Sequence, residues 1–267
     1  MNPRRWHPSP LIAGSALLHV AVAGLLAARP GDWPLPLGLL AADHLLLSAQ
    51  GLWPRSRGLG PNWTRLPAAA AADGAVALTI DDGPDPELTP RVLDLLDAAG
   101  ARASFFCIGA RARRHPRLIA EIVRRGHAVE NHSEHHRHTF SLLGPRAMLR
   151  EIATAQATLA ERAGEAPRFF RAPAGLRNPW LDPILHRLDL RLASWTRRGF
   201  DTRERNPARV RTRLLRDLDA GDILLLHDGH AAHTAGGEAV VLAVLPVLLT
   251  ELATAGLHSV TLRSTLA

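Results

Sequence analysis

The stretch Ala75-Val-Ala-Leu-Thr-Ile-Asp81-Asp82-Gly83-Pro84 decides the fold of this chain. Its first six residues are apolar or β-branched and predict a buried strand, which a glycine-proline turn signal ends. Two consecutive carboxylates therefore stand at the end of a strand, where their side chains diverge and can do different jobs. An ordinary Asp-Gly-Pro turn without further function is the alternative interpretation.

Short apolar strands alternate with amphipathic helices from this point to Leu262. Further strands are expected over 103–107, 127–130, 168–171, 190–195, 222–227 and 257–262, and helices over 89–99, 116–125, 145–162, 181–187, 207–218 and 238–255. The alternation favours an α/β fold with a mainly parallel sheet. Because the polar motifs fall at strand ends, we expect a distorted (β/α) barrel of about seven parallel strands.

A histidine cluster, His132-Ser133-Glu134-His135-His136, follows the third predicted strand. His132 and His136 are four residues apart, so on a helical turn their rings would point the same way and grip one ion. With Asp82 they offer one carboxylate and two imidazoles, which leaves positions open for water and substrate, as in a catalytic divalent-metal site. Zinc is the expected ion. Histidine pairs are also common as solvent-facing or structural residues, and three nearby histidines are not expected to bind the metal: His127, His135 and His138.

Arg171 follows the apolar pair Phe169-Phe170 and is the candidate partner of a catalytic base. A base beside a metal must stay ionised and yet accept a proton, and a nearby arginine can hold and tune it. The alternative is an ordinary surface arginine.

His227 ends the apolar run Ile223–Leu226, which is suited to a fully buried strand. The ring would stand at the mouth of that strand, where a leaving amine needs a proton donor. Asp201 can hydrogen-bond the imidazole and keep it charged. His230 and His233 are expected to be loop residues near the site and not ligands.

Five motifs stand in one order along the chain: 81–84, 132–136, 171–175, 195–201 and 224–227. This ordered set resembles the polysaccharide deacetylase family, carbohydrate esterase family 4, over roughly Ala75 to Leu262. The resemblance implies a metal-dependent hydrolase that removes N-acetyl groups from N-acetylated sugars or polysaccharide. Metal-activated water would attack the amide carbonyl, with Asp81 as base and His227 as acid.

The resemblance also implies the remaining roles. Asp82, His132 and His136 would bind the metal, Arg171 would orient the base, and Asp201 would tune the acid. The backbone N–H of Ala174 would help to hold the oxyanion, and Trp195 and Leu226 would line the pocket for the acetyl methyl group.

Two motifs depart from the family pattern. Ala174 stands where an aromatic residue is usual, Arg198 where a first acid is usual, and Thr202 where a tryptophan is usual. These changes concern the substrate groove more than the chemistry. Two alternatives stay open: a deacylase of O-acetyl or other acyl sugars, and a catalytically inactive sugar-binding membrane protein.

The composition limits the other classes of function. The chain has 267 residues, 46% of them apolar, and a formal net charge of +7, which raises nucleic acid as a partner. The arginines are spread over predicted helix faces without interleaved aromatic residues, so we expect solvated faces and no nucleic-acid partner. Cys107 is the single cysteine, which excludes an internal disulfide and predicts a small buried hydrophobe.

Residues 1–53 are predicted to form a membrane region, 54–74 a linker, and 75–267 the catalytic domain. The apolar run 11–28 is close to the length of a spanning helix, and a second run, 35–53, contains Asp43 and His44. A cleaved signal peptide is the alternative for the first run. The protein is thus expected at the cell membrane. Arg4, Arg5, Arg55, Arg57 and Arg65 flank the two runs, so a hairpin would leave the catalytic domain in the cytoplasm, whereas a single span would place it outside.

Overall fold

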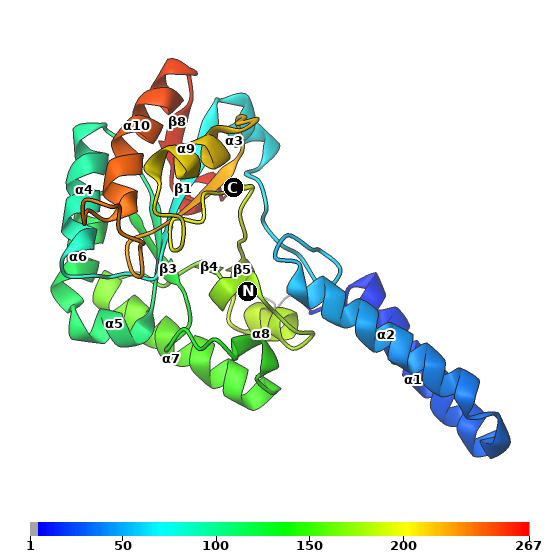
Figure 1. The fold of residues 1–267 in the computed structure, drawn as a ribbon. Helices are drawn as coiled ribbons and strands as arrows, with labels where there is room; N and C mark the ends of the chain where they lie inside the picture. The colour runs from blue at the N-terminus through cyan, green and yellow to red at the C-terminus, as the bar shows by residue number, and fades with distance from the viewer. Residues whose placement is uncertain (1–4, 267) are drawn as a thin grey trace.

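A parallel sheet lies at the centre of the catalytic domain in the computed structural model, which describes residues 5–266 (Figure 1). Arg4, used above as a flanking charge, lies outside this range. The strands are β1 (Ala75–Asp81), β2 (Ser104–Cys107), β3 (Ala128–Asn131), β4 (Phe169–Phe170), β5 (Arg191–Leu192), β6 (Arg197–Arg198), β7 (Ile223–His227) and β8 (His258–Val260). Their order is β5-β4-β3-β2-β1-β7-β6, and β8 pairs with the beginning of β1. The predicted α/β fold with a distorted, partial barrel is confirmed. The region predicted as one strand over 190–195 contains only β5, and the short β6 follows it.

Helices surround this sheet (Figure 1). They are α4 (Leu88–Ala98), α5 (Gly109–Arg114), α6 (Pro116–Arg124), α7 (Pro145–Ala163), α8 (Leu181–Arg187), α9 (Pro207–Leu215) and α10 (Val240–Thr254). The largest apolar cluster joins β1, β2 and β7 to α4, α6, α9 and α10. Burial of these apolar side chains fixes the sheet in place, and Cys107 lies fully buried among them, as expected for a small hydrophobe.

The register of the central strands aligns the ends that carry polar residues. Asp81 at the end of β1 is paired with Phe106 of β2 and with His227 of β7. In a parallel sheet the carboxyl ends of neighbouring strands meet at one edge. The strand pairing by itself therefore places Asp81 beside His227.

The segment predicted as a linker packs against the sheet. Trp63 forms a parallel bridge with Ala193, just after β5, and Arg65 forms an antiparallel bridge with Asp222, just before β7. Leu66 is buried, and the short helix α3 (Ala68–Ala72) follows. Residues 63–66 thus connect two separate parts of the sheet. The domain boundaries at 53, 54, 74 and 75 stay a prediction.

Two long apolar helices project away from the catalytic domain side by side (Figure 1). They are α1 (Pro10–Ala28) and α2 (Pro34–Leu52), and a short 3-10 turn, Pro30–Asp32, joins them. By length and composition both can cross a membrane, with mean hydropathies of 2.1 and 1.2. Helices of 19 residues are about 28 Å long, close to the roughly 30 Å of a bilayer core.

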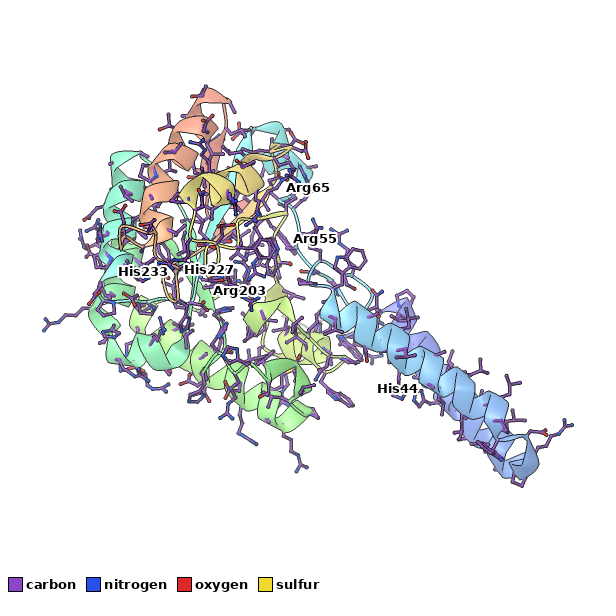
Figure 2. All side chains as sticks on the ribbon, in the orientation of Figure 1. His44, Arg55, Arg65, Arg203, His227 and His233 are labelled. Atoms are coloured by element: carbon purple, nitrogen blue, oxygen red, sulfur yellow. The ribbon has the colours of Figure 1, made fainter. Side chains whose placement is uncertain are left out.

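Polar groups of the two apolar helices face one another. The Ser15 hydroxyl donates to Oδ2 of Asp43 at 2.7 Å, and the Nε2 atoms of His19 and His44 are 3.3 Å apart. Figure 2 shows His44 on the hairpin and Arg55 at the end nearer the catalytic domain. Asp43 and His44 of the second run are therefore paired with residues of the first run.

Candidate active site

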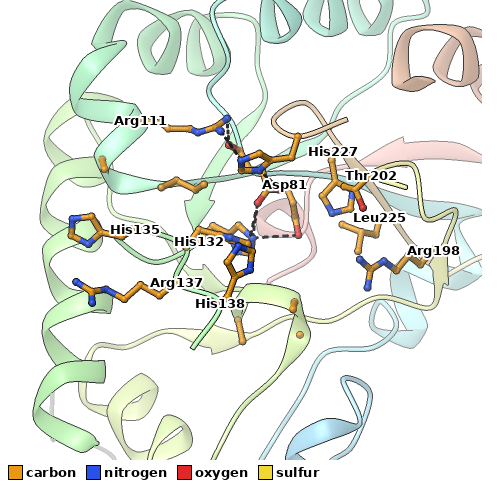
Figure 3. Close-up of a pocket in the computed structure, with 18 of the residues that line it drawn as sticks. Asp81, Arg111, His132, His135, Arg137, His138, Arg198, Thr202, Leu225 and His227 are labelled. Carbon is orange, nitrogen blue, oxygen red and sulfur yellow. Dashed lines mark hydrogen bonds and ion pairs between the residues drawn. The ribbon is translucent and has the colours of Figure 1, made fainter. Parts of the chain in front are cut away.

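A pocket of about 720 Å³ opens at the carboxyl ends of the central strands (Figure 3). Asp81 and Asp82 enter it from β1, His132 and His136 from the loop after β3, and His227 from β7. Residues from distant parts of the sequence meet here because parallel strands present their carboxyl ends at the same edge.

Asp82, His132 and His136 form a possible metal site. Their ligand atoms all lie within 4.8 Å of one another, and Oδ1 of Asp82 is 3.3 Å from Nε2 of each histidine. This oxygen is buried and has no hydrogen-bond partner among the described residues, as expected of a carboxylate oxygen that binds a cation. One carboxylate and two imidazoles match the donor preferences of zinc and leave coordination positions free.

Neighbouring groups prepare these ligands for a metal. The carbonyl of Arg171 lies 2.9 Å from Nδ1 of His132, and because a carbonyl only accepts, Nδ1 carries the proton and Nε2 is free to bind metal. Burial raises the pKa of Asp82, but its polar contacts with His132 and His230 and the charges of His132 and His136 outweigh burial and hold this pKa below its usual range. Burial, together with repulsion from His132, lowers the pKa of His136 to about 4. The Asp82 carboxylate and the neutral His136 imidazole are ligand forms, whereas the charges of Asp81 and Asp82 outweigh burial and raise the pKa of His132, which binds a metal only without its Nε2 proton.

The histidines are brought together by a loop and not by a helix. Residues 132–136 are irregular, with positive φ angles at Ser133 (64°) and His136 (49°). The expected helical turn was wrong, although the two rings lie 4.7 Å apart between centroids. Asn131 supports the loop by accepting a hydrogen bond from the Ser133 backbone N–H at 2.9 Å.

Asp81 is held by Arg171 in the interior of the barrel. The guanidinium donates from Nη1 to Oδ1 of Asp81 at 2.6 Å and to the Thr79 hydroxyl at 2.8 Å, and from Nη2 to the Ser194 carbonyl at 2.8 Å. It also stacks on Phe106, 4.1 Å from the ring centroid. Arg171 is 1% exposed, so the alternative of a surface arginine does not hold. A charge-assisted bond of this kind fixes one carboxylate oxygen and leaves the other directed at the pocket.

His227 and Asp201 form the second charged pair. Oδ1 of Asp201 is 2.8 Å from Nδ1 of His227, and Oδ2 accepts from the His227 backbone N–H at 2.8 Å. Burial lowers the pKa of His227, but the charge and hydrogen bond of Asp201, with smaller effects of Asp81 and Asp82, raise it to about 9. The imidazole is therefore protonated at neutral pH, and its Nε2 side lies at the pocket.

The predicted pocket wall is only partly placed as expected. Trp195 and Ala174 line the pocket, and Ala174 has a positive φ of 55°. Leu225, not the predicted Leu226, is the leucine that lines it (Figure 3). Successive side chains of a strand point to opposite faces, so Leu225 shares the face of His227, whereas Leu226 packs into the main apolar cluster. The correction to Leu226 follows from this alternation.

Two further residues contact Asp82 at the pocket. Arg111 of α5, to which the sequence assigned no role in the site, donates to the Asp82 carbonyl at 3.0 Å and lies 3.0 Å from Nε2 of His230. His230, predicted to be a loop residue near the site, lies 3.2 Å from Oδ2 of Asp82. The proximity of His230 to His227 in the sequence was the only signal.

The remaining histidines named above differ in their position relative to the pocket. His135 and His138 line the pocket, His127 is buried elsewhere, and His233 is outside the pocket lining.

Comparisons with known proteins agree with this geometry. The sequence model of the polysaccharide deacetylase family matches residues 68–193. A peptidoglycan-N-acetylglucosamine deacetylase of Bacillus cereus is 31% identical over 188 residues, which cover 70% of this chain and 85% of the relative. A chitooligosaccharide deacetylase of Sinorhizobium fredii is 35% identical over 175 residues, which cover 61% and 76%.

Solved structures share the fold. A crystal structure of a peptidoglycan N-acetylglucosamine deacetylase superposes with a TM-score of 0.69 at 26% identity, covering 76% of this chain and 92% of the other. A family 4 carbohydrate esterase from Streptomyces lividans, in complex with acetate, gives a TM-score of 0.63 at 32% identity, covering 70% and 91%.

The fold and the pocket are those of a hydrolase. Two carboxylates, a histidine pair and the buried, protonated His227 lie at the strand ends of a partial (β/α) barrel. The chain belongs to the polysaccharide deacetylase family. The relatives named above are deacetylases of peptidoglycan N-acetylglucosamine and of chitooligosaccharide.

Proposed function

We propose that this protein is a membrane-anchored, divalent-metal-dependent enzyme that removes N-acetyl groups from sugars, with zinc as the expected ion. The observation that carries the proposal is the meeting of Asp82, His132 and His136 with two further charged pairs around one pocket. Their donor set suits zinc. When bound, the cation would polarise the substrate carbonyl and acidify water.

The chain's own residues then divide the proton transfers. Asp81, with one oxygen held by Arg171, acts as the base that accepts a proton from the attacking water. His227, kept protonated by Asp201, acts as the acid that donates a proton to the leaving nitrogen. The backbone N–H of Ala174 contributes to oxyanion stabilisation, and Trp195 and Leu225 enclose the acyl methyl group.

The names of the relatives support an N-acetylated glycan as substrate. One acts on peptidoglycan N-acetylglucosamine and another on chitooligosaccharide. Hydrolysis of O-acetyl or other acyl groups is the second candidate, since the same groups would serve an ester. An inactive sugar-binding protein is disfavoured because both charged pairs and all three candidate ligands are present.

The N-terminal hairpin is proposed to span the membrane. Both helices have the length and apolarity to cross it, and their polar side chains are paired with each other. Trp33 at the far turn and Trp53 at the near end are both exposed, as aromatic residues at the two membrane interfaces are. With arginines flanking the near end, this topology places the catalytic domain in the cytoplasm. A reporter enzyme fused after Leu262 tests this topology. Activity of a reporter that functions only outside the cytoplasm would overturn the hairpin topology.

Acetate release tests the catalytic proposal. The full chain, purified in detergent, is incubated with N-acetylglucosamine oligomers or an O-acetylated sugar, with zinc or after chelation. The full chain is preferable to a fragment beginning near residue 70, because Trp63 and Arg65 bridge to the sheet. We expect zinc-dependent release from the N-acetyl substrate, lost in Asp81→Asn and retained in Glu251→Gln, an exposed control on α10. Activity of Asp81→Asn equal to that of the wild type would refute the assignment of the base.

A further inference from the structure

The pocket carries more positive charge than hydrolysis of a neutral sugar requires. Two carboxylates line it, Asp81 and Asp82. Five arginines also line it: Arg111, Arg114, Arg137, Arg198 and Arg203. The buried Arg171 already neutralises the charge of Asp81, and Asp82 belongs to the candidate metal site. Among residues 5–266, only Arg137 of the five pairs with a carboxylate, Glu151. Four guanidiniums therefore face the pocket without an acidic partner.

Arg198 is the most informative of these four. It is partly buried, and its Nε atom is enclosed without a hydrogen-bond partner among the described residues. Its guanidinium lies 5.2 Å from the Trp195 ring centroid and 5.0 Å from that of Phe200, which holds it at the pocket wall (Figure 3). Among residues 5–266 no carboxylate forms an ion pair with Arg198, and burial lowers its pKa more than the charges of Asp81 and Asp201 raise it, so an anion from outside the chain would stabilise the guanidinium.

The same pocket lies next to the base of the hairpin. Gly175 lines the pocket, and a Cβ atom at this position would lie 2.6 Å from Trp195 and 2.7 Å from Pro54, which follows α2. The Arg177 backbone N–H donates to the Gly51 carbonyl of α2 at 3.1 Å, and Arg55 donates to the Thr196 carbonyl at 3.4 Å. The pocket rim is thus attached directly to the end of an apolar helix.

We propose that the substrate is an N-acyl sugar joined through phosphate to a membrane lipid. This inference rests on the proposed deacetylase function and specifies its substrate class. Guanidinium groups bind phosphate oxygens with two parallel hydrogen bonds. Four guanidiniums without a carboxylate partner line the pocket, which is more positive charge than a substrate with a single carboxylate would balance. The hairpin holds the pocket at the membrane surface, where a lipid-linked sugar is presented.

The test compares three N-acetylated probes with the full chain in phosphatidylcholine vesicles. They are the neutral N-acetylglucosamine tetramer, soluble N-acetylglucosamine 1-phosphate, and N-acetylglucosaminyl diphosphate polyprenol. We expect the lipid-linked probe to have the lowest KM. In Arg198→Gln the KM for both phosphate-bearing probes should increase roughly tenfold or more relative to the neutral tetramer, the effect of losing one charged hydrogen bond. Arg198→Lys should restore part of the preference, and Arg209→Gln, an exposed control on α9, should behave as the wild type.

Binding measured by calorimetry separates this inference from the proposed function. Zinc-dependent hydrolysis of all probes without preference for phosphate would overturn the substrate class and leave the deacetylase function intact. Tight binding of the sugar phosphates that is lost in Arg198→Gln, without hydrolysis of any probe, would support the anionic ligand and refute the function. Equal KM values for the soluble and the lipid-linked phosphate would overturn the lipid as the source of the charge.

Discussion

Replacement of Asp201 by asparagine tests the assignment of His227 as the acid. The carboxylate contacts both the imidazole and the backbone N–H of His227, each at 2.8 Å. Burial opposes protonation of the ring, and the charge of Asp201 is the largest influence that restores it, raising the pKa from 6.5 to about 9. Asparagine preserves the size and one acceptor but removes the charge. The pKa of His227 should therefore fall toward its ordinary value.

The size of the effect follows from the same pKa values. A rise from 6.5 to about 9 corresponds to about 3 kcal/mol of preference for the imidazolium in the folded state. Because the folded-state pKa is the higher one, this stability is fully present below pH 6.5 and is lost as the pH rises toward 9. Asp201→Asn should thus lower the free energy of unfolding by up to about 3 kcal/mol near pH 6 and by much less near pH 10.

Two assays measure these changes. Urea unfolding at the two pH values gives the stability difference, and kcat/KM between about pH 5 and 10 at fixed zinc gives the alkaline limb of the activity profile. We expect that limb to move to lower pH and kcat at pH 7 to fall about 100-fold. Asp217→Asn, an exposed control, should change neither. An unchanged alkaline limb, or an equal loss of stability at both pH values, would refute the role of Asp201 in tuning an acid.

Four other substitutions test three separate parts of the site. Arg171→Met should leave a buried Asp81 carboxylate unpaired, lowering the free energy of unfolding by about 3–5 kcal/mol in urea titrations and abolishing acetate release; a stable, active variant would contradict the pairing. Asp82→Asn should weaken zinc binding in calorimetry by at least about tenfold, and unchanged affinity would exclude it as a ligand. Leu225→Ala should broaden acyl-chain selectivity in hydrolysis assays, whereas Leu226→Ala should cost about 2–5 kcal/mol of stability without changing selectivity. The reverse pattern would restore Leu226 to the pocket.

Strand ends were the part of the molecule that sequence reasoning located best. Apolar runs such as Ile223–Leu226 are buried on both faces of a parallel sheet, so their positions and the polar residues that end them can be read without the structure. The assignment of Leu226 to the pocket came from the family resemblance and not from the strand itself. Side chains two residues apart in a strand share a face, so His227 selects Leu225.

The conformation of the irregular segments could not be predicted from the sequence pattern. The loop that carries His136 depends on positive φ angles at non-glycine residues, which have no sequence signature comparable to glycine. The bridges of Trp63 and Arg65 join segments more than 100 residues apart in sequence, so local composition indicated only a linker. Arg111 and Arg114 reach the pocket from the short helix α5, whereas Arg113 of the same helix pairs with Glu134, and charge alone does not distinguish them.

The altered fourth motif separates catalysis from substrate recognition. The family resemblance led us to expect two acids here, and Arg198 replaces one of them. Asp201 alone occupies both hydrogen-bonding positions of His227, the ring nitrogen and the backbone N–H, so the acid stays fully supported. The position of the missing acid is then free to face the pocket wall, where a guanidinium stacked on Trp195 adds positive charge. A change that leaves the catalytic pair intact and reverses the charge of the groove is expected to alter which glycan is bound and not how its amide is cleaved.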